Sequence, residues 1–210
     1  MSEQQREQNI KSIIRLEDRV AKCRRCAPLL KCTSRPAVGR GDLEPDTMIV
    51  FEAANDLNRN QQWIIGLHNS VRQYCGGHKV YHTFMVRCQS RVCPQSQGND
   101  CFLTSRLLDH NDICLLNNQP CDGIAVKPTN EAIINCLTYL LEEIAALRPS
   151  RVILMGPRVT DFVLKACGVY HQTYDRPAYR AGEHLFIIAK EEHQVDSSEL
   201  QHIADAVGGM

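Results

Sequence analysis

Residues 129–156 read TNEAIINCLTYLLEEIAALRPSRVILMG, which predicts a long helix followed directly by a short apolar strand. Thr129 can cap the start of the helix, Glu131 lies in its first turn and Pro149 ends it. The apolar face of the helix repeats at helical spacing and comprises Ile133, Ile134, Leu137, Leu140, Leu141 and Ile144. A helix that leads into an apolar strand is a building unit of α/β folds.

The same alternation continues on both sides of this unit. Strands are predicted at residues 47–51, 79–87, 151–155 and 185–189, and helices at residues 3–22, 60–74, 129–147, 159–167 and 197–207. Strands that alternate with helices pair in parallel and are covered on both faces. We therefore expect an α/β protein, a three-layer α/β/α fold with a central, mainly parallel four-stranded sheet.

The chain of 210 residues suits a single domain at residues 1–210 with a sizeable core. Residues 89–128 form a weakly patterned, cysteine-rich insert within it, with a short helix predicted at residues 102–108. The apolar fraction of 43% and the charged fraction of 23% are ordinary for a soluble globular protein. No apolar run has the length of a membrane span, and residues 1–8 are too polar for a secretory signal. We expect a cytoplasmic protein with no membrane partner.

Eleven cysteines need an explanation. In a reducing compartment they are not a disulfide framework, so we expect some to be buried thiols and some to bind metal. Cys23 and Cys26 form a C-x-x-C pair after the first helix, Cys88 ends the second strand and Cys136 lies in the long helix. A zinc ribbon would add a second C-x-x-C, and a redox dithiol would follow the first strand. Single cysteines far apart in the chain are compatible with an iron–sulfur cluster, which takes four thiolates.

Charge is distributed unevenly, although the net charge is zero. No acidic residue lies between Asp18 and Asp42, where the basic residues are Arg19, Lys22, Arg24, Arg25, Lys31, Arg35 and Arg40. This basic stretch has three interpretations: a solvated face, a surface for a phosphate backbone, or counter-charge for an anionic thiolate cluster.

Six segments then follow one another in a characteristic order and spacing. They are C-R-R-C at 23–26, V-G-R-G at 38–41, F-E-A-A-N at 51–55, V-Y-H-T-F-M-V-R-C at 80–88, E-A-I-I-N-C-L-T-Y-L at 131–140 and P-S-R-V-I-L-M-G at 149–156. In these segments, the chain resembles the iron–sulfur (family 4) uracil-DNA glycosylases over residues 16–189.

The resemblance implies a 4Fe–4S cluster bound by Cys23, Cys26, Cys88 and Cys136. We expect its role to be structural, because it would tie the first helix to the second strand and the long helix. A competing assignment replaces Cys136 by a cysteine of the insert. A second zinc or iron–sulfur site is also predicted within the insert, on Cys93, Cys101, Cys114 and Cys121.

Base excision requires that the nucleotide leave the stack, and that a carboxylate stand near the sugar or its attacking water. By resemblance, Glu52 takes the carboxylate position of the family's G-E-A-P-G loop. His193 lies near the family's H-P motif, whose histidine stabilises the departing base, although no proline follows it here. Glu52 and His193 are therefore the candidate catalytic residues.

The expected substrate-binding residues depart from the family pattern. Ala53 is kept, but Ala54 and Asn55 replace a Pro and a Gly, and Phe84 replaces the Asn that reads uracil. A phenyl ring supplies neither the donor nor the acceptor of an amide.

These departures leave three functional hypotheses open. The leading one is a monomeric, 4Fe–4S uracil-DNA glycosylase-like hydrolase that cleaves N-glycosidic bonds in single- or double-stranded DNA with altered or reduced activity. The second is a catalytically inactive iron–sulfur protein that binds nucleic acid or a protein partner. The third is a zinc-stabilised interaction module.

Overall fold

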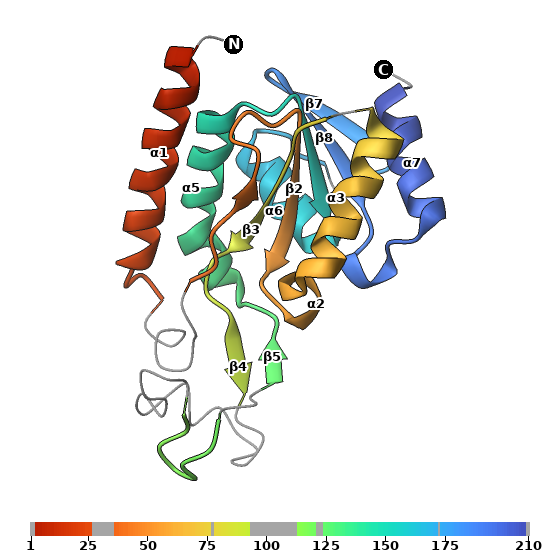
Figure 1. Cartoon of the computed structure of the whole chain (residues 1–210). Helices are drawn as coiled ribbons and strands as arrows, with labels where there is room; N and C mark the ends of the chain where they lie inside the picture. The colour runs from red at the N-terminus through yellow and green to blue at the C-terminus, as the bar shows by residue number, and fades with distance from the viewer. Residues whose placement is uncertain are drawn as a thin grey trace.

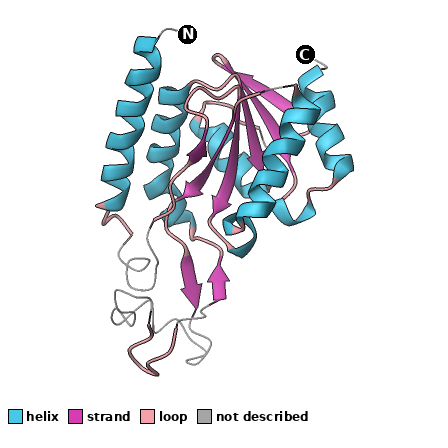
Figure 2. Ribbon diagram, in the orientation of Figure 1, coloured by secondary structure: helices cyan, strands magenta, loops and turns pink. Residues whose placement is uncertain are grey.

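The computed structural model of the chain describes residues 3–26, 36–76, 78–92, 113–120, 124–171 and 173–208. Within these residues, one mixed six-stranded sheet forms the centre of the fold (Figure 2). Its spatial order is β1 (Arg40–Gly41), β3 (Val80–Val86), β2 (Thr47–Ala53), β6 (Arg151–Met155), β8 (His184–Ala189) and β7 (Ala178–Ala181). The four inner strands β3, β2, β6 and β8 are parallel, and each edge strand is antiparallel to its neighbour.

Helices cover both faces of this sheet and complete the three layers seen in Figure 1. One face is covered by α1 (Glu3–Ala21), α5 (Asn130–Leu147) and α6 (Pro157–Ala166). The other face is covered by α3 (Gln61–Cys75) and α7 (Ser197–Gly208), with the short α2 (Asp56–Arg59) leading into α3. None of the helices in the described ranges combines the length and apolar character needed to cross a membrane.

Strand β2 shows why helices must pack on both faces of the sheet. Met48 and Val50 belong to the core beneath α1, α5 and α6, whereas Ile49 and Phe51 belong to the core beneath α3 and α7. All four side chains are almost fully buried, and they alternate because successive residues of a strand face opposite sides. A strand that is apolar on both faces is stable only between two layers of helices.

The predicted fold class is confirmed, and the four predicted strands form the parallel centre of the sheet. The sheet is wider than predicted, because β1 and β7 add two edge strands. These strands have two and four residues, too few to show a two-residue periodicity in the sequence. In β1, Gly41 has φ +133°, and a Cβ there would lie 2.4 Å from the carbonyl oxygen of Val80, so only glycine allows this close approach.

The described ends of the predicted insert at 89–128 form a two-stranded ribbon. β4 (Ser90–Val92) pairs antiparallel with β5 (Ile124–Val126), so the insert leaves and re-enters the domain at one place. Within it, residues 113–120 form a turn closed by a bridge between Ile113 and Pro120. The helix predicted at residues 102–108 lies outside the described residues.

Helix α5 begins and ends for local reasons that its sequence shows. The Thr129 hydroxyl accepts a hydrogen bond from the Ala132 N–H at 3.2 Å, which caps the first turn. Arg148 follows the last turn in the left-handed conformation, and its N–H donates to the Ile144 carbonyl at 2.8 Å. The buried face of α5 is mainly apolar but includes Cys136 and Glu143, the two residues through which α5 enters the candidate site.

Candidate metal centre and strand-end cleft

Four cysteines from three separate segments line one small cavity, which we call the thiol cavity. Cys23 and Cys26 follow the C-terminal end of α1. Cys88 follows β3, and Cys136 lies on α5. The remaining lining residues are Val20, Arg25, Val86, Arg87, Asn135 and Tyr139. The structure thus brings together all four cysteines that the sequence singles out as ligands.

Burial favours the protonated form of three of these thiols, Cys26, Cys88 and Cys136. Burial and, to a smaller extent, the neighbouring thiols of Cys136, Cys26 and Cys23 together raise the pKa of Cys88 to about 12. Burial also raises the pKa of Cys136 and of Cys26. Four thiolates around one cavity would repel one another unless a cation lay among them, and metal ions that bind thiolates supply such a charge.

The donor set at the thiol cavity is four cysteines. Among the described residues, no group of three or more His, Cys, Asp or Glu side chains is placed so that it could hold a metal ion. A zinc ion needs its sulfur ligands to converge at about 2.3 Å from one centre. In a four-iron cluster each thiolate binds a different iron, so the ligands surround a larger core. Four thiols around a cavity are compatible with that second arrangement.

The C-x-x-C loop is held against α5 by an arginine. The Arg25 guanidinium donates to the Asn135 carbonyl at 3.1 Å and to the Thr138 hydroxyl at 2.8 Å. It also lies over the ring of Tyr139, 4.7 Å from the ring centre. These contacts position Cys23 and Cys26 opposite the helix that carries Cys136.

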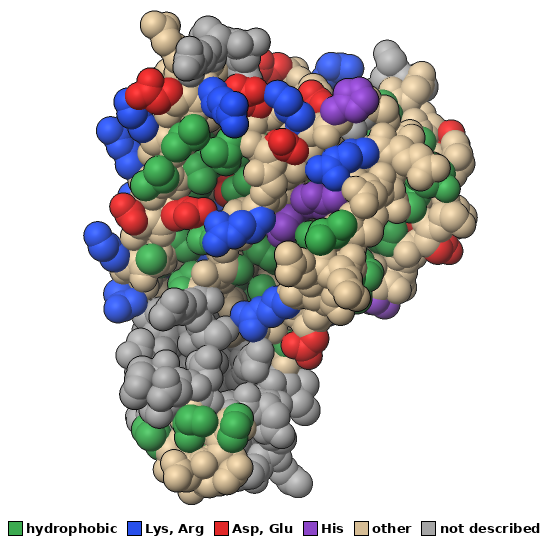
Figure 3. All heavy atoms as spheres, viewed as in Figure 1, with side chains coloured by type: hydrophobic (Ala, Val, Ile, Leu, Met, Phe, Trp, Pro, Cys, Tyr) green, Lys and Arg blue, Asp and Glu red, His purple; other side chains and the backbone are tan. Residues whose placement is uncertain are grey.

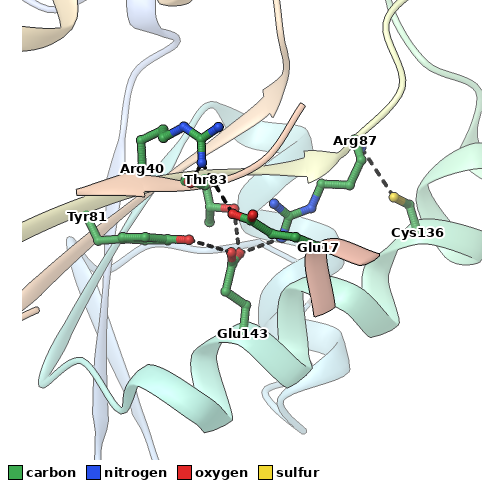
Figure 4. Close-up of polar contacts among 8 residues, drawn as sticks. Glu17, Arg40, Tyr81, Thr83, Arg87, Cys136 and Glu143 are labelled. Carbon is green, nitrogen blue, oxygen red and sulfur yellow. Dashed lines mark hydrogen bonds and ion pairs between the residues drawn. The ribbon is translucent and has the colours of Figure 1, made fainter. Parts of the chain in front are cut away.

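A second set of contacts lies between β3 and α5, and Figure 4 shows it. The Glu143 carboxylate accepts hydrogen bonds from the Tyr81 hydroxyl at 2.7 Å and from the Thr83 hydroxyl at 2.5 Å. It also pairs with the Arg87 guanidinium at 2.5 Å. Burial and Glu143 raise the pKa of Tyr81, which keeps its hydroxyl a donor. We call these four residues the Glu143 network.

The Glu143 network touches the thiol cavity through the backbone of Arg87. The Arg87 N–H donates to the Cys136 sulfur at 3.3 Å, and Cys88 is the next residue in the chain. Sequence reasoning missed this network. Its signal was Glu143 itself, a charged residue on the apolar face of α5 between Leu140 and Ile144.

A second cavity of about 290 Å³ opens at the carboxyl ends of the parallel strands, and we call it the strand-end cleft. Ligands of open α/β sheets bind at this edge. The lining residues lie in or after the last residues of β2, β5, β6 and β8. They are Glu52, Ala53, Ala54, Asn55, Ala125, Val126, Lys127, Pro128, Met155, Gly156, Arg158, Val159, Glu191, Glu192 and His193.

Charged side chains dominate the chemistry of the strand-end cleft. Glu52 forms an ion pair with Arg158, whose guanidinium also donates to the Pro128 carbonyl at 2.9 Å. Burial raises the pKa of Glu52, and Arg158 opposes that shift. Lys127 lies 2.9 Å from Glu191. The cleft therefore holds a half-buried carboxylate whose charge is balanced by a neighbouring guanidinium.

The carboxylates on the far side of the cleft have polar partners as well. Glu192 accepts hydrogen bonds from the side-chain amides of Asn55 and Asn58. The His193 ring stands 3.6 Å from a Glu191 oxygen, with its side chain 61% exposed. Asn55 thus links the loop after β2 to the loop after β8.

Five of the six residues predicted to act on the substrate line this cleft, and one does not. Phe84 lies on β3 with 4% of its surface exposed, and its ring packs against Phe51 at 5.9 Å and His82 at 6.0 Å. Its apolar ring is buried beneath α3 and not presented to the cleft. Arg158, which sequence reasoning did not select, is the cleft's main cation; only a contact between residues far apart in the chain identifies it.

The predicted second metal site falls mostly outside the described residues. Of its four cysteines, only Cys114 is described, as a buried residue in the turn at 113–120; the positions that remain outside are Cys93, Cys101 and Cys121. The competing assignment, in which an insert cysteine replaces Cys136, likewise depends mostly on residues outside the described part of the chain.

The basic stretch is partly neutralised where it is described. In Figure 3, basic and acidic side chains are interspersed on the face shown. Arg19 pairs with Glu142, and Arg40 pairs with Glu17 at 3.3 Å. Arg25 donates its hydrogen bonds to Asn135 and Thr138 of α5. These contacts favour a surface of local ion pairs for this part of the chain.

The thiol cavity and the strand-end cleft are the two places where the fold gathers reactive side chains. No protein-family model and no curated protein matches the chain, so its function is inferred from these two sites.

Proposed function

We propose that this chain is a 4Fe–4S, uracil-DNA glycosylase-like protein that acts on bases of DNA in the reducing cytoplasm. The observation that carries the proposal is the convergence of Cys23, Cys26, Cys88 and Cys136 around one cavity. Three segments that are distant in the sequence bring their cysteines to the same cavity. A metal cluster would account for this convergence, since it takes four thiolates.

The proposed role of the cluster is structural. Bound iron would link α1, the end of β3 and α5 by coordinate bonds. Arg25 and the Arg87 N–H already hold the cysteine-bearing segments against one another. A structural cluster adds to the stability of the fold because the unfolded chain cannot bind it.

The strand-end cleft would receive a base that has left the stack. Glu52 would accept a proton from a water molecule as the water oxygen attacks the sugar carbon and the N-glycosidic bond breaks. The electron pair of that bond leaves with the base, and His193 would stabilise the resulting anion. Arg158 pairs with Glu52 and opposes the rise in its pKa that burial causes.

Uracil is not the base that this cleft favours. Phe84, at the position of the family's uracil-reading amide, is buried in the core. The cleft instead offers Asn55 as an amide, and Asn55 is engaged with Glu192. We therefore propose altered or reduced excision activity.

One observation favours a second candidate function, a catalytically inactive iron–sulfur protein that binds nucleic acid or a partner. The Glu52 carboxylate is already paired with Arg158, and Glu191 and Glu192 line the same cleft. Acidic side chains there would repel DNA phosphates.

Metal analysis tests the cluster. Anaerobically purified protein is expected to contain four irons and four sulfides per chain, by the definition of the cluster, and to lose most of both in Cys136→Ala. Cys167→Ala is the matched control, because Cys167 is a thiol outside the thiol cavity. Zinc without sulfide, or equal iron in the two variants, would reject the proposal.

A strand-cleavage assay separates the two functions. Single- and double-stranded DNA with uracil or other altered bases is incubated with the protein, and abasic sites are cleaved with alkali. Activity that falls about a hundredfold or more in Glu52→Gln supports excision, with the exposed Glu183→Gln as control. Binding without cleavage on every substrate supports the inactive protein.

A further inference from the structure

Burying the ion pair of Arg87 and Glu143 costs desolvation free energy, which suggests that the pair serves a function beyond packing. The two side chains are only 3% and 2% exposed. Desolvation of a buried pair offsets much of its attraction, and apolar side chains of similar volume are often as stabilising. The pair lies between β3 and α5, where apolar packing would hold the layers together equally well.

The hydrogen bonds of the network are unevenly satisfied. Glu143 is fully engaged, since it accepts from Tyr81, Thr83 and Arg87. Arg87 is not, because its buried Nε has no hydrogen-bond partner among the described residues. Buried polar atoms nearly always have a partner, so an orphaned N–H indicates a group that belongs there.

The position of Arg87 indicates what that group is. Arg87 lines the thiol cavity and directly precedes Cys88. Its backbone N–H already donates to the Cys136 sulfur at 3.3 Å. One residue therefore lines the cavity, contacts one predicted ligand through its backbone N–H and directly precedes a second, while its guanidinium is bonded to Glu143.

We propose that Arg87 is a positioning residue for the cluster, and that its guanidinium, fixed by Glu143, donates its unused N–H to a cluster sulfur and raises the reduction potential. The inference deepens the proposed function and rests on it. An electron added to the cluster increases its negative charge. A nearby cation and an N–H donor stabilise the reduced state more than the oxidised state. Glu143 sets the geometry of the guanidinium and partly offsets its charge.

The reduction potential of the full chain tests this role. Glu143→Gln is compared with the double variant Arg87→Gln/Glu143→Gln, so that neither protein contains a buried carboxylate without a partner. The double variant is expected to be harder to reduce, by about tenfold in the reduction equilibrium, or about 59 mV for one electron. Tyr81→Phe is the control, because it removes one hydrogen bond to Glu143 without changing the charge, and it should leave the potential unchanged.

A merely structural role predicts a different result. Stability would fall in all three variants while the potentials of Glu143→Gln and the double variant coincide. That result would overturn the proposal. Wild-type protein with no iron and no sulfide would instead refute the proposed function itself, so the two failures are distinguishable.

A second measurement decides the question if the double variant does not fold. Protein labelled with ¹⁵N only at arginine Nε is reduced, and the cluster is studied by pulsed paramagnetic resonance. Arg25 also lines the cavity, so the label is placed in an Arg25→Lys background. A ¹⁵N coupling to the cluster supports the Arg87 contact, and its absence overturns it.

Discussion

The thiol cavity and the strand-end cleft are built on the same sheet in opposite ways. Around the thiol cavity, the charged groups of the Glu143 network are buried and bonded to one another. In the strand-end cleft, Glu52 and Arg158 remain partly exposed, with side chains 17% and 30% accessible. Buried networks fix a structure, whereas charges held in an open cleft serve ligands and reduce stability. Substitutions should therefore affect stability at the first site and chemistry at the second.

The largest effect is expected in the Glu143 network. Glu143→Ala leaves the Arg87 guanidinium buried without its partner, which should lower the free energy of unfolding by about 3–5 kcal/mol. Denaturant unfolding measures this change. Glu142→Ala is the matched control, since Glu142 pairs with Arg19 on the surface and should cost less than about 1 kcal/mol. Similar losses in both variants would show that the buried pair is not the stabilising element.

Next in size is a backbone effect at the cleft. Gly156 has φ +93° and ψ 161°, a region that only glycine occupies readily, and an added Cβ would lie 2.9 Å from Glu191 Cγ. Gly156→Ala should lower the free energy of unfolding by about 2 kcal/mol. Gly168 also has a positive φ, +82°, but in Gly168→Ala the added Cβ meets nothing within 4 Å, so the loss should be smaller and come from backbone strain alone. Equal losses would mean that the cleft does not constrain this turn.

A pH effect of similar or smaller size is expected from the buried histidine pair that joins α3 to β3. His68 Nε2 lies 3.1 Å from His82 Nδ1, and burial lowers the pKa of each ring to about 4. The unfolded chain takes up these protons near the ordinary pKa of 6.5 and the folded chain does not. Stability is therefore complete above pH 6.5 and falls as the pH decreases towards 4.

The expected loss over that pH window is about 1–2 kcal/mol, once screening is included. Urea unfolding at pH 7.5 and pH 5 measures most of it. The double variant His68→Leu/His82→Phe should have a flatter pH dependence, and His202→Gln, at an exposed position, should not. An unchanged slope in the double variant would contradict the prediction.

The smallest effect is expected at Glu52, and its sign is opposite. Burial raises the pKa of this carboxyl, so stability falls as the pH rises through the raised value, and the ionised form weakens the fold at pH 7. Glu52→Gln should raise the free energy of unfolding at pH 7 by less than about 1 kcal/mol. Glu44→Gln should change stability in the other direction, because Lys79 lowers the pKa of Glu44. A marked loss in Glu52→Gln would place the residue in the structural scaffold.

Much of the fold could be predicted because local patterns are strong where burial is complete. The apolar run at β2 and the capped helix α5 are examples. The edge strand β1 could not be predicted, since two residues carry no periodicity and their pairing with β3 depends on distant parts of the chain.

The two sites also differ in how far they could be predicted from the sequence. The convergence of the cysteines followed from an ordered set of motifs. The Arg158–Glu52 pair joins segments with no sequence signal that relates them, and the burial of Phe84 depends on packing against Phe51 and His82. Tertiary contacts between polar residues decide the cleft, and a single sequence does not display them.

Helix α5 has a consequence for how damage to the protein would spread. Near its start, Pro128 and Asn130 accept hydrogen bonds from Arg158 in the cleft wall. Cys136 follows about 9 Å further along the same rod. If Cys136 binds the proposed cluster, an oxidant that removes the cluster would act on a helix that also supports the cleft wall around Glu52. Damage at the thiol cavity would then reach the strand-end cleft along a single helix.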